Sequence, residues 1–323
     1  MLPPGASDPM DALNEAQRRA ALHDSGPLIV LAGPGTGKTR VIIARLRRLL
    51  DQGTEPESLL ALTFSRKAAE EIRLRLAESV GPTVADRIHA STFHGFGYSL
   101  LTRFGDMLGL PRERDIIDSA QSRRLLRALI HDHALLRELA PSGPDAPVAA
   151  FREFLSRCRR AARTSADAQT FADTWARRLR DDAYSLTDEA RQAESFKHRL
   201  FADCARLMTL YERACLRRGA LSYDDCLTLP LRLLDEHPVV GAILRQEIRR
   251  IVVDEFQDID RGQIELLQRL APPRSRECDL CVVGDDAQAI YGFRGAEPRS
   301  FARFAELWPG AATIALGVNY RSG

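Results

Sequence analysis

Short apolar runs alternate along the chain with longer segments in which leucine, isoleucine and alanine recur every three or four residues. Each run is continuous, without the polar alternation of a half-exposed strand, which is typical of a strand buried on both faces of a parallel sheet. The runs fall at residues 28–31, 59–64, 251–253, 280–283 and 313–316, and residues 89–96 form a further strand-to-loop segment. Strands that alternate with helical patterns predict an α/β fold, with helices flanking a parallel sheet.

The pattern changes between about Gly105 and Gly219, where glycine is scarce and arginine, alanine and leucine dominate at helical spacing. This stretch predicts an all-α subdomain that is inserted into the sheet domain. The boundaries that we predict are 1–12 for a flexible leader, 13–104 and 221–311 for the sheet domain, and 105–220 for the insertion.

The composition is that of an ordinary globular protein, with 45% hydrophobic residues, 28% charged residues and a formal net charge of +2. This charge alone does not indicate a nucleic-acid partner. Six scattered cysteines without a signal peptide predict a reduced, cytoplasmic protein. Cys278 and Cys281 have metal-ligand spacing, but no second ligand pair accompanies them, so we expect no zinc site. No apolar run approaches the length that spans a bilayer, so we expect no membrane partner.

A glycine-rich loop follows the first apolar run and precedes a helical pattern. Strand, loop and helix in this order are the context that a phosphate-binding P-loop requires. Glycines let successive backbone N–H groups point into one concavity, and the helix N-terminus adds its positive dipole end. Lys38 would reach the β- and γ-phosphates of ATP, and the Thr39 hydroxyl would hold Mg²⁺. The loop residues that would surround the phosphates are Ala32, Gly33, Pro34, Gly35, Thr36 and Gly37.

Gln17 lies about a dozen residues before the P-loop strand, and it has two interpretations. Asn14 and Gln17 have the spacing of a capping box that starts a helix. The side-chain amide of Gln17 also matches the donor and acceptor on the N6/N7 edge of adenine. Both interpretations can hold together, because a cap would fix the glutamine in place.

A β-branched run ends in Asp254 and Glu255, as in a Walker B segment. Asp254 at the strand end could hold Mg²⁺, and Glu255 could polarise the attacking water as a general base. The alternative is an ordinary strand that ends in solvated acids, which the upstream P-loop disfavours. Gln288 follows another strand and could sense the γ-phosphate.

Aromatic residues follow two of the predicted strands, at the edge where open α/β sheets bind their ligands. Phe64, Tyr291 and Phe293 could stack on unpaired bases of a nucleic acid. For Phe64 a place in the core is an equally simple explanation. His94 lies in a segment rich in side chains that contact phosphates and bases, although a single histidine is usually structural.

Together these segments resemble the UvrD/Rep/PcrA family of superfamily 1 DNA helicases, over residue 13 to the end of the chain. Seven motifs occur in the family's order and spacing. Two of the chain's three lysines, Lys38 and Lys67, fall within them. The segments are LNEAQ for the Q motif, AGPGTGKT for motif I, LTFSRKAAEEIRLR for Ia, STFHGF for the next, VVDEFQDID for II, VVGDDAQAIYGFRGAEP for III and NYRS for IV.

The resemblance implies a first RecA-like motor domain with an inserted DNA-binding subdomain. It also implies roles for single residues. Gln17 would read adenine, Arg40 would join Lys38 and Thr39 at the triphosphate, and Gln288 would couple the γ-phosphate to DNA. Tyr320 would stack on adenine, and Arg321 would act as an arginine finger. The implied DNA contacts are Phe64, Lys67, His94, Tyr291 and Phe293.

The implied activity is ATP-dependent translocation and unwinding in the 3′ to 5′ direction, on single-stranded DNA and its junctions with duplex. The resemblance places the start of a second, truncated motor domain at residues 312–323, so we expect this chain to be a motor half that unwinds nothing alone. Two alternatives are the motor segment of a RecB-like helicase-nuclease and a non-enzymatic nucleotide-dependent DNA-binding module. Departures from the family pattern are Ser65, Arg66, Ala287, Ala289 and Phe293.

Overall fold

The fold was obtained as a computed structural model, which describes residues 10, 12–161, 163–181, 187–273, 279–285 and 299–320. The chain packs as two compact units. One contains the residues up to Leu100 together with those from Leu229 onward, and the other contains Leu101–Thr228. Each unit is described by itself below.

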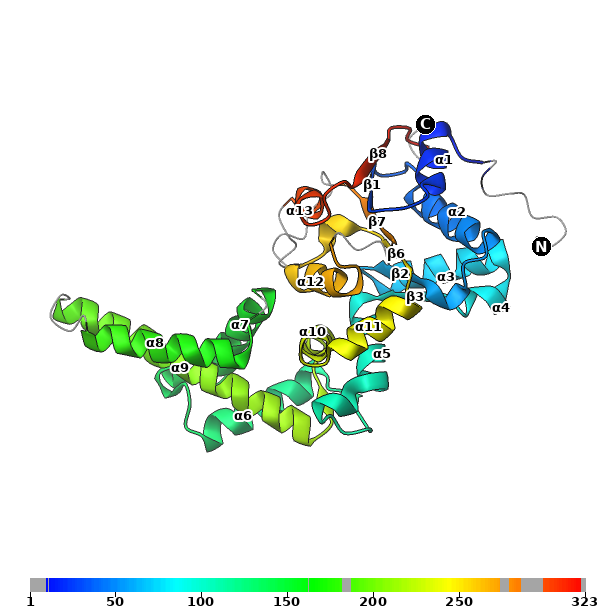
Figure 1. Cartoon of the computed structure of the whole chain (residues 1–323). Helices are drawn as coiled ribbons and strands as arrows, with labels where there is room; N and C mark the ends of the chain where they lie inside the picture. The colour runs from blue at the N-terminus through cyan, green and yellow to red at the C-terminus, as the bar shows by residue number, and fades with distance from the viewer. Residues whose placement is uncertain are drawn as a thin grey trace. The chain divides into compact units, whose positions relative to one another are not determined.

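A six-stranded sheet forms the centre of the first unit, with strand order β3-β2-β6-β7-β1-β8 and every pair parallel (Figure 1). β1, β2 and β7 are apolar and almost entirely buried, as expected for strands covered on both faces. This arrangement confirms the predicted α/β class. The strands are β1 (Leu28–Ala32), β2 (Leu59–Thr63), β3 (His89–Thr92), β6 (Arg250–Val253), β7 (Asp279–Gly284) and β8 (Ala312–Leu316).

Helices cover both faces of this sheet (Figure 1). On one face, Val41, Ile42 and Leu46 of α2 and Ile72 of α3 pack into the core that the strands form. On the other face, α12 and α13 lie with the aromatic side chains Phe256 and Phe304 in edge-to-face contact. The helices are α1 (Glu15–Leu22), α2 (Lys38–Asp51), α3 (Arg66–Val80), α4 (Pro82–Ala85), α11 (Pro238–Glu247), α12 (Arg261–Leu270) and α13 (Ser300–Leu307), with 3₁₀ turns η1 (Pro56–Ser58) and η5 (Phe256–Asp258).

The position of β8 corrects the boundary predicted from the sequence. Residues 312–323 were expected to begin a second motor domain, but β8 pairs in parallel with β1 from Leu28↔Ala312 to Ala32↔Leu316. β8 therefore completes the first sheet. The apolar run predicts a strand correctly, but the run itself carries no information on which strand will pair with it.

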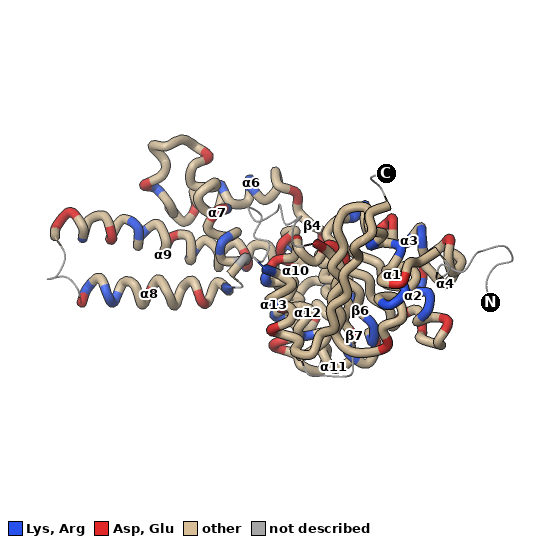
Figure 2. The backbone as a smooth tube through the Cα atoms, turned by 90° about the horizontal axis from the view of Figure 1, so that it is seen from above, with Lys and Arg blue, Asp and Glu red and all other residues tan. Residues whose placement is uncertain are grey.

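The second unit is mainly helical and has its own core, which includes Phe151, Leu207 and Tyr211. α8 and α9 lie side by side as a long helical hairpin, and both helices carry acidic and basic residues (Figures 1 and 2). Its elements are η2 (Gly105–Leu108), β4 (Asp115–Ile116), α6 (Ser119–Asp132), η3 (Arg137–Ser142), α7 (Ala146–Arg160), α8 (Ser165–Asp181), α9 (Asp188–Arg217) and β5 (Ala220–Leu221), while α5 (Phe93–Phe104) and α10 (Asp225–Glu236) contain the unit boundaries.

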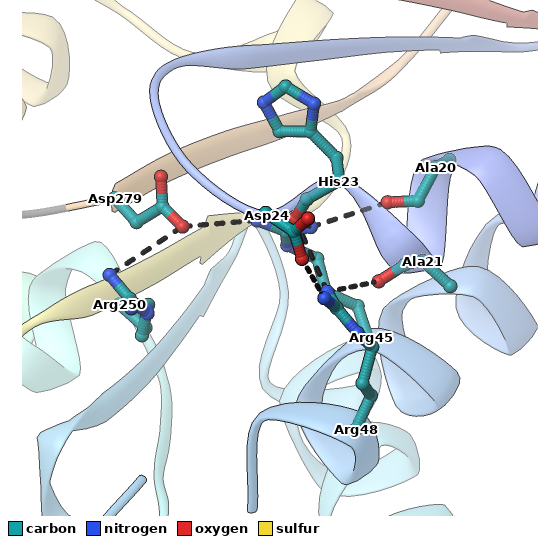
Figure 3. Close-up of polar contacts among 8 residues, drawn as sticks. All are labelled: Ala20, Ala21, His23, Asp24, Arg45, Arg48, Arg250 and Asp279. Carbon is teal, nitrogen blue, oxygen red and sulfur yellow. Dashed lines mark hydrogen bonds and ion pairs between the residues drawn. The ribbon is translucent and has the colours of Figure 1, made fainter. Parts of the chain in front are cut away.

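A buried ion network holds the segment before β1 against α2 and β7 (Figure 3). Arg45 on α2 donates to Asp279 Oδ2 at 3.3 Å and to the backbone oxygens of Ala20 and His23 at 3.3 and 2.6 Å. Arg250 Nη1 lies 3.6 Å from the same carboxylate oxygen. Burial raises the pKa of Asp279 above its usual range, although both arginines act to lower it. Desolvation of Arg45 and Asp279 is therefore costly, and removing either residue would leave the other as a buried charge without its partner.

Replacing Asp279 with asparagine should lower the free energy of unfolding by about 3 kcal/mol, because the guanidinium of Arg45 would then be buried without a counter-charge. Urea unfolding followed by circular dichroism measures this change. Asp51→Asn is the control, since Asp51 pairs with Arg47 but its side chain is 59% exposed; the expected cost is below about 1 kcal/mol. Equal effects of the two substitutions would contradict a structural role for the buried network.

Candidate functional site

The candidate site lies along one edge of the six-stranded sheet. Because all strands run in parallel, the segments that follow them meet at the carboxyl edge. The P-loop follows β1, Asp254 and Glu255 follow β6, and Asp285 follows β7. The candidate phosphate-binding and catalytic residues of the sequence analysis follow these same strands.

The P-loop connects β1 to α2 through two glycines in left-handed conformations, Gly35 with φ 71° and Gly37 with φ 84°. Thr36 is buried and donates its hydroxyl to Gly33 O at 2.8 Å. Gly37 is the N-cap of α2, and no side chain caps the helix there. Since glycine has no side chain that could cap the helix, the first N–H groups of α2 receive no acceptor from the N-cap residue, as a phosphate site requires.

Gln17 is fully buried and forms the capping box predicted from the sequence. Gln17 N donates to Asn14 Oδ1 at 2.9 Å, and Asn14 N donates to Gln17 Oε1 at 3.0 Å. The side-chain nitrogen of Gln17, Nε2, donates to Thr36 O of the P-loop at 2.8 Å. α1 is therefore fastened to the loop through this glutamine, and recognition of adenine by Gln17 stays a prediction.

Replacing Gly37 with alanine should weaken binding of Mg·ATP at least about tenfold. The new Cβ would lie 2.7 Å from Gln17 Nε2, and the residue would keep a φ of +84°. Equilibrium titration with a fluorescent ATP analogue measures the affinity. Gly53→Ala is the matched control, because Gly53 has φ +85° but an added Cβ there would meet nothing within 4 Å. A variant at Gly37 that binds like the Gly53 control would contradict this account of the loop.

Lys38 and Glu255 form an ion pair at the centre of the site. Lys38 Nζ lies 2.8 Å from Glu255 Oε2, and the lysine side chain is 13% exposed. Gln257 Nε2 donates to the same carboxylate oxygen at 2.8 Å. Glu255 has a left-handed backbone, with φ 51° and ψ 48°. Such a conformation is costly for a non-glycine residue and is often found at functional sites. The structure therefore brings the P-loop lysine and the predicted general base together.

Asp254 is buried at the end of β6, and its Oδ1 accepts the N–H of Glu255 at 3.0 Å. Burial, followed by the charge of Glu255, raises the pKa of Asp254 to about 6. The same two causes, in the same order, raise the pKa of Asp258 to about 6.

This donor set fits Mg²⁺, since a divalent cation would stabilise a buried carboxylate that the protein leaves poorly solvated. A magnesium ion in a P-loop site takes one or two protein oxygens and completes its shell with water and phosphate. Asp254 and Thr39 are the residues that would hold it. When bound, the ion would neutralise charge on the phosphates. No group of three or more His, Cys, Asp or Glu side chains with metal-site geometry occurs in the described part of the chain.

The raised pKa of Asp254 predicts an unusual dependence of stability on pH. Its pKa rises from 3.8 when unfolded to about 6 when folded. Between these values the folded state binds more protons, so the free energy of unfolding falls as the pH rises. In magnesium-free buffer at pH 8, Asp254→Asn should therefore stabilise the protein, on the order of 2 kcal/mol. The gain should disappear near pH 4. Urea titrations at both pH values test this, with Asp51→Asn as the control. A loss of stability at pH 8 would contradict it.

Tyr320 lies against the P-loop, although it is more than 280 residues away in sequence. Its backbone N–H donates to Gly35 O at 2.9 Å, and Asn14 Nδ2 donates to its hydroxyl at 2.7 Å. The ring is 54% exposed. The short segment after β8 therefore adds an accessible aromatic ring beside the loop and the capping residue. Stacking of this ring on adenine remains a prediction.

The other residues predicted for the site follow different strands or lie outside the described residues. Phe64 is half-buried after β2, Lys67 is exposed in the first turn of α3, and His94 is half-buried in the first turn of α5. Arg40 donates to Ala12 O at 3.4 Å. Gln288, Tyr291, Phe293 and Arg321 lie outside the described residues, as does Cys278.

The sequence reasoning missed two residues of the site, Gln257 and Asp258. Both lie in the segment VVDEFQDID, in which the sequence analysis assigned roles only to Asp254 and Glu255. The spacing could have found them, because a residue two positions after Glu255 can turn back to its carboxylate in a tight turn.

No helix in the described ranges is long and apolar enough to cross a membrane.

Comparison with known proteins finds a family and relatives that match nearly the whole chain. The family model for the UvrD/REP helicase N-terminal domain matches residues 13–309. A protein named ATP-dependent DNA helicase PcrA from Staphylococcus aureus is 31% identical over 315 residues, which cover 97% of this chain and 38% of that protein. A PcrA from Leuconostoc citreum is 32% identical over 314 residues, 97% of this chain and 37% of its own length.

The chain thus spans less than two fifths of the length of these curated relatives. The family match itself covers nearly all of the chain, and it includes every segment that meets at the carboxyl edge up to Asp285. The resemblance stated from the motifs is therefore confirmed. The chain belongs to the UvrD/REP helicase N-terminal domain family.

Proposed function

We propose that this chain is the ATP-binding motor half of a DNA helicase that translocates 3′ to 5′ on single-stranded DNA. Mg·ATP would be its substrate, and single strands and their junctions with duplex would be its nucleic-acid partners. The observation that carries the proposal is the approach of Lys38 to Glu255 at 2.8 Å, directly beside a P-loop and a buried aspartate. This is the set of groups that phosphoryl transfer to water needs.

Each group has one task in the proposed hydrolysis. Lys38 would leave Glu255 and bind the β- and γ-phosphates of ATP, which are the stronger anion. Glu255 would then accept a proton from the attacking water. Asp254 and Thr39 would hold the ion that accompanies the phosphates. Gln17, Tyr320 and the capping residue Asn14 would bind or orient the base.

Single-stranded DNA would cross the same edge of the sheet. Phe64 and His94 follow β2 and β3, the two strands farthest from β8, and Lys67 is exposed beside them. An aromatic ring with a nearby cation is the combination that binds unpaired bases and their backbone. A second motor domain, in the same or another chain, would supply the arginines that complete the nucleotide site.

The test is ATP hydrolysis by the 323-residue chain, with and without oligothymidylate, alone and with a second motor domain added. We expect slow turnover alone, no unwinding of duplex, and DNA-stimulated turnover when the second domain is present. A nuclease product from labelled DNA would instead favour a RecB-like helicase-nuclease. Nucleotide binding with no turnover under any of these conditions would favour a non-enzymatic DNA-binding module and would contradict the proposal.

A further inference from the structure

The amide of Gln257 contacts two segments that border the nucleotide site. Its side chain is 3% exposed and lies in η5, directly after the strand that carries Asp254. Nε2 donates to Glu255 Oε2 at 2.8 Å, and Oε1 accepts the backbone N–H of Asp285 at 3.0 Å. β6 and β7 are neighbours in the sheet, so this one side chain links the carboxyl ends of both.

Gly284 makes room for this link. A Cβ at residue 284 would collide with Gln257 Oε1 and would lie 3.0 Å from Phe256 N. The φ of Gly284 is not in the left-handed region, so the backbone conformation does not require glycine here. The close approach of the Gln257 amide does require it. The link is thus built from a buried amide and a glycine on the neighbouring strand.

The link also reaches the P-loop. A Cβ at Gly33 would lie 3.6 Å from Asp285 Oδ2, which places that carboxylate beside the loop. Gln257 therefore binds the backbone of Asp285, whose carboxylate lies beside Gly33, and the carboxylate of Glu255, which contacts Lys38 of the same loop.

Two donors share a single oxygen of Glu255. Lys38 and Gln257 both contact Oε2, and no residue of the described part donates to Oε1. When ATP draws Lys38 away, Gln257 would remain as the donor that fixes the carboxylate. Oε1 would stay available to accept the proton of the attacking water.

We propose that Gln257 is a positioning residue for this hydrolysis: it holds the Glu255 carboxylate by Oε2 and ties it to the carboxyl end of β7 through Asp285. The inference rests on the proposed function, because it needs Glu255 to act as the base. Groups that orient a reacting side chain typically contribute tenfold to a hundredfold to activity.

Gln257→Met keeps the length of the side chain and removes both hydrogen bonds. In single-turnover hydrolysis with protein in excess, we expect its rate to fall about 10- to 100-fold. The dissociation constant of Mg·ATPγS should change less than about threefold, because no contact to the phosphates is lost. Gln257→Glu keeps the acceptor for Asp285 N–H but places a carboxylate against Glu255, so it should lose the rate as well.

A second measurement tests the hydrogen bond from Asp285 separately from the hydrogen bond to Glu255, and it requires no ATP turnover. Amide hydrogen exchange at Asp285 should be about tenfold faster in Gln257→Met and close to wild type in Gln257→Glu. The control is Gln263→Met, since Gln263 is also buried but its amide serves the capping box of α12 with Asp260. That variant should lose some stability and leave both readouts unchanged.

The outcomes distinguish this inference from the proposed function. Wild type that is folded but binds no Mg·ATPγS would overturn the proposed function and the inference with it. Wild type that binds the nucleotide, with Gln257→Met equal to it in rate, would overturn only the positioning role. Asp285 exchange that is the same in wild type and Gln257→Met would overturn the link itself.

Discussion

Lys38→Ala should reduce ATP hydrolysis about 100- to 1,000-fold, because it removes the one ammonium group that the P-loop supplies to the phosphates. Lys38 begins α2, and its Nζ lies close enough to Glu255 to exchange that carboxylate for a bound phosphate. Lys38 also lowers the pKa of Asp254 and of Asp258. Its loss would therefore leave these two carboxylates harder to ionise. The measurement is hydrolysis stimulated by oligothymidylate, with the second motor domain present.

Two further variants make the Lys38 experiment specific. Lys38→Arg should not restore activity, since a planar guanidinium does not replace a compact ammonium in a narrow loop. Lys197→Ala is the control, because Lys197 is exposed on α9 and pairs with Glu194 three residues earlier in the same helix. Hydrolysis by Lys38→Ala within about threefold of the Lys197 control would contradict the role given to the P-loop.

Glu255→Gln should separate binding from hydrolysis. The substitution keeps the size of the side chain and an oxygen that can still accept from Gln257, but it removes the proton acceptor. Loss of a general base typically costs a factor of about 100 to 10,000 in rate. Affinity for Mg·ATP should stay equal or increase, since Lys38 is no longer held by a full negative charge. Rapid-quench hydrolysis and nucleotide titration measure the two quantities.

The matched control for Glu255→Gln is Glu265→Gln on α12. Glu265 is also partly buried and also pairs with basic side chains, Arg261 and Arg269. It lies away from the P-loop, so hydrolysis should not change. If Glu255→Gln lost nucleotide binding and hydrolysis together, its role would be structural, and another group would have to serve as the base.

The inner strands β1, β2, β6 and β7 of the first sheet were predictable because each contains a short apolar run that the sheet buries on both faces. The starts of two elements were also predictable from local chemistry: the capping box of Asn14 and Gln17, and the glycine before Lys38. These features depend on residues a few positions apart. The pairing of β8 with β1 joins residues nearly 300 positions apart, and no local pattern encodes it.

The sequence indicated several residues of the candidate site but not the contacts between them. Sequence indicated Lys38 and Glu255 separately, but it could not show that they form an ion pair or that Glu255 has a left-handed backbone. The link from Gln257 to Asp285 was not predicted, because it joins residues 28 positions apart that follow two neighbouring strands. The buried pair of Arg45 and Asp279 was missed for the same reason, since charged residues in a sequence suggest the surface.

Calorimetric titration of the folded chain with ATP shows whether the carboxyl edge of this sheet binds Mg·ATP. We expect one saturable site that requires magnesium and that disappears in Lys38→Ala but not in Lys197→Ala. A wild-type chain that is folded by circular dichroism and yet releases no heat of binding at saturating Mg·ATP would contradict it.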